Sequence, residues 1–355
     1  MWKYNKGEWS EIYTFAYLLS TGVLYSADSE LNKIEEVYFP VLKIIREEIE
    51  QQKIDYCYGD TIKIYRGEKL LQEISKDRFT EIVDTLFEAI PRGSRAFEIP
   101  EAESFFTSIY CDKVKANSSK KEDITLQIQD IHTGIAPICG FSIKSFLGAK
   151  PTLINAGNNT NFVYVVSGCN DEIMDTLNAI DSKSKILDRL AYLREKGCVL
   201  TPQEHSISPQ FEENLQFIDT VMPSILQYLL LYSYQYGIRH IGEAVAKLKE
   251  YNPMGYSNSE IYAYKVKKLL CACALGLTPE RKDWLGAEDA NGGYITVKAD
   301  GSVVCYHLYN RTEFENYLFN HTLFDSPSTG RYNYASIYKE NGEYKMKLCL
   351  QVRFS

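Results

Sequence analysis

Two short segments, KEDITLQI from Lys121 to Ile128 and GFSIKS from Gly140 to Ser145, are separated by a turn-like sequence and carry the clearest strand pattern of the chain. In the first part Ile, Leu and Ile alternate with polar residues, and this period of two predicts a half-buried strand. The intervening residues 130–137 contain Asp, Thr, Gly and Pro, which are typical of a turn. We therefore predict a β-hairpin with Asp123 at the entrance of the first strand and Lys144 within the second.

This hairpin carries a candidate catalytic pair. Ser142 and Lys144 share one face of the second strand, opposite Phe141 and Ile143. Hydrolysis of a phosphodiester with metal assistance needs an acid that holds a divalent cation and a cation beside the attacking water. Asp123 and Lys144 have these properties. The structural alternative is that Asp123 ends a strand and Lys144 protects a sheet edge, and both interpretations stay open from the hairpin alone.

A second source of carboxylates lies near the N-terminus. Apolar residues at 12, 15, 16 and 19 recur at helical spacing and predict an amphipathic helix. Glu8 and Glu11 lie three residues apart in its first turns, so they project from one face. Such acids complement the helix dipole in most proteins. Alternatively, Glu8 or Glu11 would supply a metal-binding carboxylate, which the serine at position 142 cannot provide.

Several segments resemble the HpaII family of type II restriction endonucleases, in the same order and nearly from end to end. The segments that carry the resemblance are Gly7-Glu8-Trp9-Ser10-Glu11, Gly140-Phe141-Ser142-Ile143-Lys144-Ser145, Thr152-Leu153-Ile154-Asn155 with Thr160-Asn161-Phe162, Gly292-Gly293-Tyr294-Ile295, Cys305-Tyr306-His307-Leu308-Tyr309-Asn310-Arg311 and Leu350-Gln351-Val352-Arg353-Phe354.

The resemblance implies a variant of the PD-(D/E)XK nuclease fold. Asp123 matches the metal-binding acid of that fold and Lys144 matches its lysine, whereas Ser142 stands where the pattern expects an acid. Glu11 is the preferred substitute for that acid, Glu8 the alternative and Glu172 a distant third.

The family further implies a reaction and partners. We expect Mg²⁺ held by Asp123, the helical glutamate and the backbone carbonyl of Ile143. The substrate is double-stranded DNA, cut at a short palindromic site containing CCGG to leave 5′-phosphate and 3′-hydroxyl ends. A homodimer matches the two-fold symmetry of such a site. A cognate DNA methyltransferase is expected to be encoded nearby.

Composition constrains the alternatives. The 355 residues carry a formal net charge of −8, which does not favour DNA binding, although a local basic cleft is compatible with an acidic total. The nine cysteines form no CxxC pair, so we expect reduced thiols in the cytoplasm and no zinc site. No apolar stretch is long enough to span a membrane. The sequence contains neither a Gly-x-Ser-x-Gly elbow nor a GxGxxG or Walker loop.

The predicted fold class is α/β (α+β), with a mixed central sheet flanked by helices and an additional C-terminal α+β region. We predict a catalytic region over 1–200 and a recognition or dimerisation region over 201–355. The expected elements are helices over 34–50, 79–90, 182–196 and much of 211–251, a hairpin over 61–67, a catalytic sheet over 123–166, and hairpins over 293–307 and 337–348.

Residues in loop-like sequence are candidates for DNA contact. Arginine and lysine read guanine edges and bind phosphates, and asparagine amides bind either. The candidates are Arg92, Arg95, Asn155, Asn158, Asn161, Lys150 and Arg331. Two other functions remain open: a repair or structure-specific nuclease on the same core, and a catalytically silent DNA-binding protein, for which the serine at 142 argues.

Overall fold

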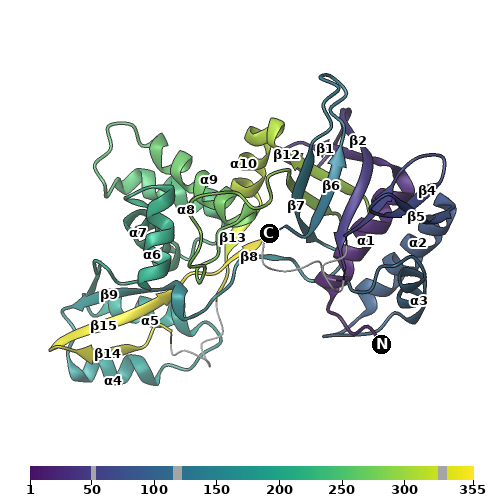
Figure 1. Ribbon diagram of the computed structural model, residues 1–355. Helices are drawn as coiled ribbons and strands as arrows, with labels where there is room; N and C mark the ends of the chain where they lie inside the picture. Colours follow the sequence, from purple (N-terminus) through teal and green to yellow (C-terminus); the bar gives the residue numbers. More distant parts are fainter. Residues whose placement is uncertain (49–52, 115–121, 327–333) are drawn as a thin grey trace. The chain divides into compact units, whose positions relative to one another are not determined.

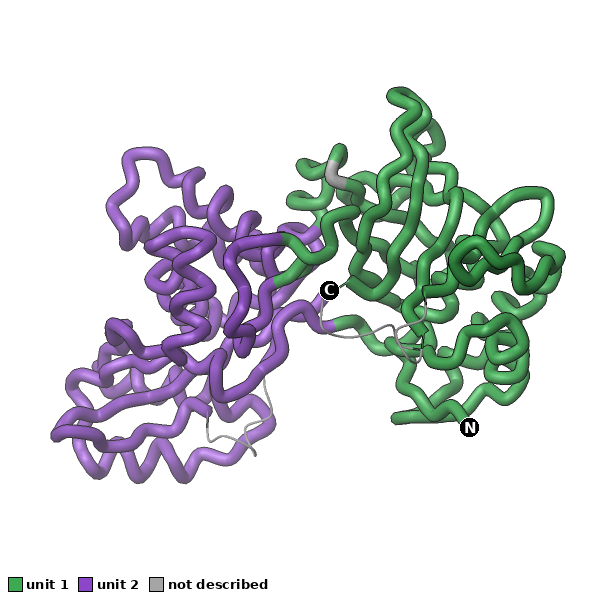
Figure 2. The backbone as a smooth tube through the Cα atoms, viewed as in Figure 1, with its two compact units in different colours: residues 1–151, 274–276, 288–317 green, residues 152–273, 277–287, 318–355 purple. Residues whose placement is uncertain are grey.

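The computed structural model describes residues 1–48, 53–114, 122–326 and 334–355, which form two compact units (Figures 1 and 2). Unit 1 comprises Met1–Pro151, Ala274–Gly276 and Glu288–Tyr317, and unit 2 comprises the described remainder. The chain does not divide near residue 200. There β10 (Val199–Pro202) pairs with β9 (Asn161–Ser167) inside unit 2, and later segments of the chain return to unit 1.

Unit 1 is built on a nine-stranded mixed sheet in the order β1-β12-β11-β7-β6-β2-β3-β4-β5, and β1 also pairs with β2. Its strands are β1 (Val23–Ala27), β2 (Lys33–Glu47), β3 (Lys53–Cys57), β4 (Ile62–Arg66), β5 (Lys69–Ile74), β6 (Ile124–Ile128), β7 (Ile138–Ser145), β11 (Gly293–Val297) and β12 (Val303–His307). Its helices are α1 (Lys6–Thr21), α2 (Lys76–Arg92) and α3 (Pro100–Ser108), and η3 (Leu308–Asn310) leads into α10 (Arg311–Asn320).

The core of unit 1 lies between this sheet and helix α1, which packs against β7 and β2 (Figure 1). Ile12 and Phe15 of α1 belong to the same buried cluster as Phe141 and Ile143 of β7. A buried ion pair fixes the chain beyond α3: Arg46 Nε lies 2.7 Å from Glu48 Oε1, and Glu48 Oε2 accepts a hydrogen bond from the backbone N–H of Asp112. These contacts hold the segment that leads toward β6.

Unit 2 contains two smaller sheets and a set of helices. The sheets have the orders β10-β9-β15-β14 and β13-β16-β8. Besides β9 and β10, its strands are β8 (Thr152–Ile154), β13 (Thr322–Phe324), β14 (Ile337–Glu340), β15 (Glu343–Cys349) and β16 (Val352–Phe354). Its helical elements are η2 (Asn158–Thr160), α4 (Asp171–Ala179), α5 (Lys185–Glu195), α6 (Pro209–Ile218), α7 (Met222–Tyr236), α8 (Ile241–Tyr251) and α9 (Glu260–Leu275).

Two expectations for the secondary structure are wrong. A helix is expected over 34–50, but β2 occupies Lys33–Glu47, and residues 49 and 50 lie outside the described residues. The run is rich in β-branched and aromatic residues and contains Pro40, which a helix interior does not tolerate. The catalytic sheet also does not extend to residue 166, because β9 pairs with β10 and β15 in unit 2. The hairpin expected over 61–67 is longer, because that range forms only β4 and its partner β5 ends at Ile74. The other predicted helices and hairpins are confirmed within a few residues.

The hairpin β11–β12 has an unexpected place. It lies between β7 and β1 in the sheet of unit 1, with β11 parallel to β7 and β12 parallel to β1. Its turn is closed by Gly301, whose φ of +84° favours glycine, and the hydroxyl of Tyr13 donates to the Gly301 carbonyl at 2.7 Å. Helix α1 therefore fixes the end of the hairpin.

Candidate active site

Strands β6 and β7 pair in the antiparallel register that the hairpin prediction requires. Ile124 lies opposite Phe141, and the backbone N–H of Asp123 donates to the Phe141 carbonyl at 2.8 Å. Asp123 itself forms a bend immediately before β6 begins. The two strands consequently bring Asp123 beside Ser142, which lies nineteen positions further along the chain.

Two hydrogen bonds orient the Asp123 carboxylate. The backbone N–H of Ile143 donates to Oδ2 at 2.7 Å, and the Ser142 hydroxyl donates to the same oxygen at 3.2 Å. Ser142 is fully buried, so its donor is held in place. Within the described ranges Oδ1 accepts no hydrogen bond, which leaves it available to a ligand. The serine thus orients the acid and does not itself act as one.

Lys144 follows Ser142 by two residues on the same face of β7 and is half-buried. Its ammonium makes no hydrogen bond or ion pair with any residue that the structure describes. A lysine with three unsatisfied donors beside an oriented carboxylate suits an anionic substrate such as a phosphate.

Strand β11 forms the other side of this face. Tyr294 is the register partner of Ser142, and Thr296 that of Lys144. Both are fully buried. Burial raises the pKa of the Tyr294 hydroxyl, and the nearby charges of Tyr317 and Asp123 raise it further. The Tyr294 ring packs on Phe314 of α10 with centroids 5.1 Å apart, so an aromatic wall borders the acid.

The sequence prediction missed an acid on the same face. A Cβ placed on Gly140 would lie only 1.9 Å from Glu122 Oε2, so the Glu122 side chain lies directly over Gly140. Gly140 precedes Ser142 by two residues and therefore shares its face. The only sequence signal for Glu122 was its position next to Asp123. Neighbouring residues in a strand point to opposite faces, so this position argued against a shared site. The chain bends at Asp123, however, and the alternation does not hold there.

The chain is similar to known restriction endonucleases over almost its whole length. The model of the HpaII restriction endonuclease family matches residues 5–354. The type II restriction enzyme HpaII of Haemophilus parainfluenzae is 36% identical over 365 aligned residues, which cover 99% of this chain and 98% of that enzyme. The chain belongs to the HpaII restriction endonuclease family. As a member it is a type II site-specific deoxyribonuclease. No solved structure matches it.

In this HpaII-family enzyme, Glu8 has a structural role. The Asn5 side chain accepts from the backbone N–H of Glu8 at 3.1 Å, and Glu8 Oε2 accepts from the backbone N–H of Asn5 at 2.9 Å. This capping box satisfies two donors at the start of α1. Glu11 lies one turn on, half-buried, on a helix that packs against the apolar face of the sheet. Glu172 is exposed on α4 in unit 2, whereas Asp123 belongs to unit 1.

The candidate DNA contacts of the family member divide between the two units. Arg92, Arg95 and Lys150 belong to unit 1 and are exposed, and Arg92 Nη2 lies 3.8 Å from Glu88. The asparagines at 155, 158 and 161 belong to unit 2, where a turn stabilised by Thr160 separates β8 from β9. Arg331 lies outside the described residues. Within the described part of unit 1, Arg92, Arg95 and Lys150 make no hydrogen bond or ion pair with Asp123 or Lys144. The role of all these candidates in DNA binding stays a prediction.

The oxygen donors of the site suit a hard cation, but they are few. The described residues hold no cluster of three or more His, Cys, Asp or Glu side chains with metal-binding geometry. Mg²⁺ is commonly bound by one or two carboxylates, with waters and substrate phosphates completing the shell. Asp123 Oδ1 and the carboxylate of Glu122, the preceding residue in the chain, are oxygen donors of the kind that Mg²⁺ prefers. No disulfide joins any of the nine cysteines, all of which are described residues.

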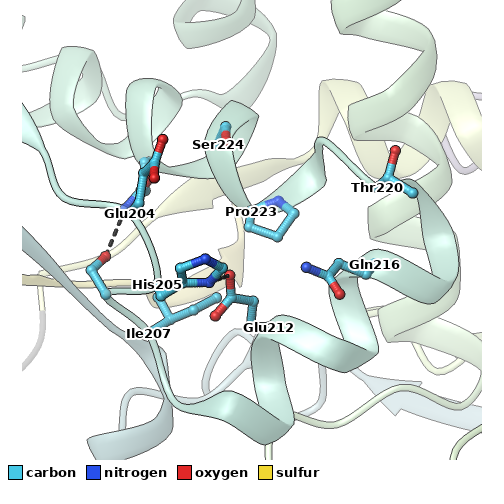
Figure 3. A pocket seen from close by; sticks show the side chains of 10 residues that line it. Glu204, His205, Ile207, Glu212, Gln216, Thr220, Pro223 and Ser224 are labelled. Atoms are coloured by element: carbon cyan, nitrogen blue, oxygen red, sulfur yellow. Dashed lines mark hydrogen bonds and ion pairs between the residues drawn. The ribbon is translucent and has the colours of Figure 1, made fainter.

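Unit 2 has a cavity of about 260 Å³ that the sequence did not predict (Figure 3). In it His205 Nδ1 lies 2.8 Å from Glu212 Oε1, and Gln227 donates to the Ser206 hydroxyl. The His205 backbone is left-handed, with a φ of +48°. The cavity contains none of the predicted site residues. None of the described helices is both long enough and apolar enough to cross a bilayer.

Proposed function

We propose that the enzyme cleaves both strands of DNA within a short palindromic site containing CCGG, using Mg²⁺ and leaving 5′-phosphate and 3′-hydroxyl ends. The observation that carries the proposal is the juxtaposition on β6 and β7: an acid oriented by Ser142 and Ile143, and an ionically unpaired Lys144 on the same face. Family membership supports the reaction class, and the resemblance of the motifs supports the recognition sequence.

The cation would be held by the Oδ1 of Asp123, by a second carboxylate and by the backbone carbonyl of Ile143. When bound, Mg²⁺ supplies polarisation of the scissile phosphate and lowers the pKa of a coordinated water. Asp123 is suited to this role because its Oδ2 is already fixed by two donors, so little reorganisation accompanies binding. Of the acids expected from the sequence, Glu11 remains a candidate for the second carboxylate.

The protein's own residues then guide the hydrolysis. Lys144 donates hydrogen bonds to the attacking water and to the equatorial phosphate oxygens, where negative charge develops. The attacking water loses a proton to solvent as its oxygen bonds to phosphorus and the bond to the 3′-oxygen breaks. The leaving 3′-oxygen takes a proton from a solvent water, which leaves a 5′-phosphate and a 3′-hydroxyl. The buried ring of Tyr294 keeps bulk water from one side of the acid and so strengthens these interactions.

DNA binding requires a local positive field, because the formal net charge is −8. We propose that Arg92, Arg95, Lys150 and Arg331, with asparagines 155, 158 and 161, contribute phosphate and base contacts. A homodimer would present two such sites to a palindrome. A companion methyltransferase and a cytoplasmic location complete the expected restriction–modification setting.

The test is digestion of a sequenced plasmid with purified enzyme and Mg²⁺, followed by mapping of every end. We expect discrete ends at CCGG, and none with the Lys144→Ala variant under the same conditions. Discrete ends at another sequence would reject the CCGG assignment. Cleavage without any sequence preference would instead support a repair or structure-specific nuclease, and tight binding without cleavage would support a silent DNA-binding protein.

A further inference from the structure

Gly140 lies beneath a carboxylate. An added Cβ would lie 1.9 Å from Glu122 Oε2 and 3.0 Å from Glu122 Cβ, and real Cβ atoms essentially never come closer than 3.0 Å to another atom. A side chain at position 140 and the observed position of the Glu122 carboxylate therefore exclude each other. The absence of a side chain at 140 creates the space in which that carboxylate lies.

The floor of this space is rigid. The backbone N–H of Gly140 donates to Asn291 Oδ1 at 2.8 Å, and its carbonyl accepts from the backbone N–H of Gly292, also at 2.8 Å. Both partners belong to the segment that leads into β11. Because β7 is fixed from this side, Gly140 has little freedom to move away from Glu122.

Glu122 lies on the same face as the proposed catalytic residues. Gly140, Ser142 and Lys144 alternate along one face of β7, and residues two apart in a strand are separated by about 7 Å. Asp123 reaches the middle of this row through its contact with Ser142. Glu122 adjoins Asp123 in the chain and lies over the first member of the row. Its carboxylate thus flanks Asp123 along β7, on the side away from Lys144.

We propose that Glu122 is the second metal-binding carboxylate of this enzyme and replaces the acid that Ser142 lacks. The inference rests on the proposed function. Two neighbouring carboxylates repel each other, and a bound dication would relieve this repulsion. The alternatives are less well placed: Glu8 closes the first turn of α1, and α1 packs against the apolar face of the sheet.

The direct test is metal binding by the Glu122→Gln variant. The change removes the charge and keeps the shape of the side chain. Mn²⁺ bound to the free protein is measured by loss of the free-ion electron paramagnetic resonance signal. We expect at least about tenfold weaker Mn²⁺ binding. In parallel, plasmid cleavage should need a correspondingly higher Mg²⁺ concentration for its half-maximal rate. Glu98→Gln, an exposed acid of the same unit, is the matched control and should change neither measurement.

Gly140→Ala tests the geometry without removing the acid. The new methyl group occupies the space of Glu122 Oε2, so the carboxylate must move. We expect weakened Mn²⁺ binding in the same direction as Glu122→Gln, and little further loss when the two changes are combined, because both act through one carboxylate. Thermal unfolding of each variant identifies any that fails to fold, and Glu122→Gln alone then decides.

The outcomes separate this proposal from the one on which it rests. Unchanged Mn²⁺ affinity in Glu122→Gln overturns the assignment, whether or not cleavage is lost. A tenfold loss in Glu11→Gln with none in Glu122→Gln would give the role to Glu11. If instead Lys144→Ala cleaves plasmid normally, the active site itself has been misplaced, and that result is independent of Mn²⁺ binding by Glu122.

Discussion

The two faces of strands β6 and β7 differ sharply in what they contact. One face carries Ile124, Phe141 and Ile143, which are buried in a cluster with α1. The other carries Ser142 and Lys144, of which the first orients Asp123 and the second is ionically unpaired among described residues. Because successive side chains of a strand point to opposite faces, one short pair of strands serves packing on one face and chemistry on the other. Stability and activity are therefore expected to respond to different substitutions only one residue apart.

The largest effect should come from Lys144→Ala on the polar face. Loss of the ammonium removes stabilisation of charge that develops in the transition state, and we expect cleavage to fall by about a thousandfold. Single-turnover cleavage of plasmid DNA measures it. The melting temperature should stay within a degree or two of wild type, because the side chain makes no ionic contact in the described structure. A large decrease in the melting temperature would show that the polar face also contributes to stability, which contradicts the proposed difference between the two faces.

On the apolar face, Phe141→Ala should have the opposite pattern. Removal of a fully buried ring leaves a cavity and should cost about 3–5 kcal/mol of unfolding free energy. Urea unfolding measures the loss, and Ile143→Val, expected to cost about 1 kcal/mol, is the smaller control. Cleavage per folded molecule should change less than in Lys144→Ala. Equal losses in that quantity would show that the core face also sets catalytic geometry.

Ser142→Ala tests how much the buried serine contributes to catalysis by orienting Asp123. It removes one of the two donors to Asp123 Oδ2 and retains the backbone donor of Ile143. We expect a loss of about 1 kcal/mol, which corresponds to a several-fold slower reaction. Comparison of cleavage rates at saturating Mg²⁺ checks it. A loss as large as that of Lys144→Ala would mean that Ser142 takes part in the chemistry directly.

The smallest effect concerns pH and His307, which ends β12. Its ring lies 4.7 Å from that of Phe39, and burial lowers its pKa, partly offset by the charge of Asp130. The unfolded chain therefore binds the proton more readily than the folded one. The contribution to stability is complete above the ordinary pKa and declines as pH falls below it. Thermal unfolding at pH 7.5 and 5.5 should show a smaller acid-induced decrease in His307→Gln than in wild type.

Secondary structure could be predicted correctly where the local hydrophobic pattern agrees with the packing of the segment in the folded protein. The alternation at Ile124–Ile128 and the turn signal at Asp300-Gly301 each match a strand or hairpin of the structure. The apolar positions of residues 34–50 fit the helical period as well as the alternation of a strand. The pairing of β2 with β1, β3 and β6 makes Lys33–Glu47 a strand. No local signal showed that β9 belongs to another sheet.

The candidate site was predictable to the same degree. Asp123, Ser142 and Lys144 come together because alternation and hairpin register are local properties. Glu122 was not predicted, since its position follows from a bend at Asp123 and from the absent side chain of Gly140. The acid favoured from the sequence, Glu11, belongs to a helix whose packing could not be read from its own spacing.

The amino-acid sequence was sufficient to predict the β6–β7 hairpin, the shared face of Ser142 and Lys144, and the family, because these depend on backbone periodicity and on short motifs. Only the tertiary structure placed β11 beside β7, with Tyr294 next to Ser142 and Asn291 beneath Gly140. The reason is physical: a parallel pair joined across some 150 residues is selected by the burial of both strands together, and neither strand encodes its partner.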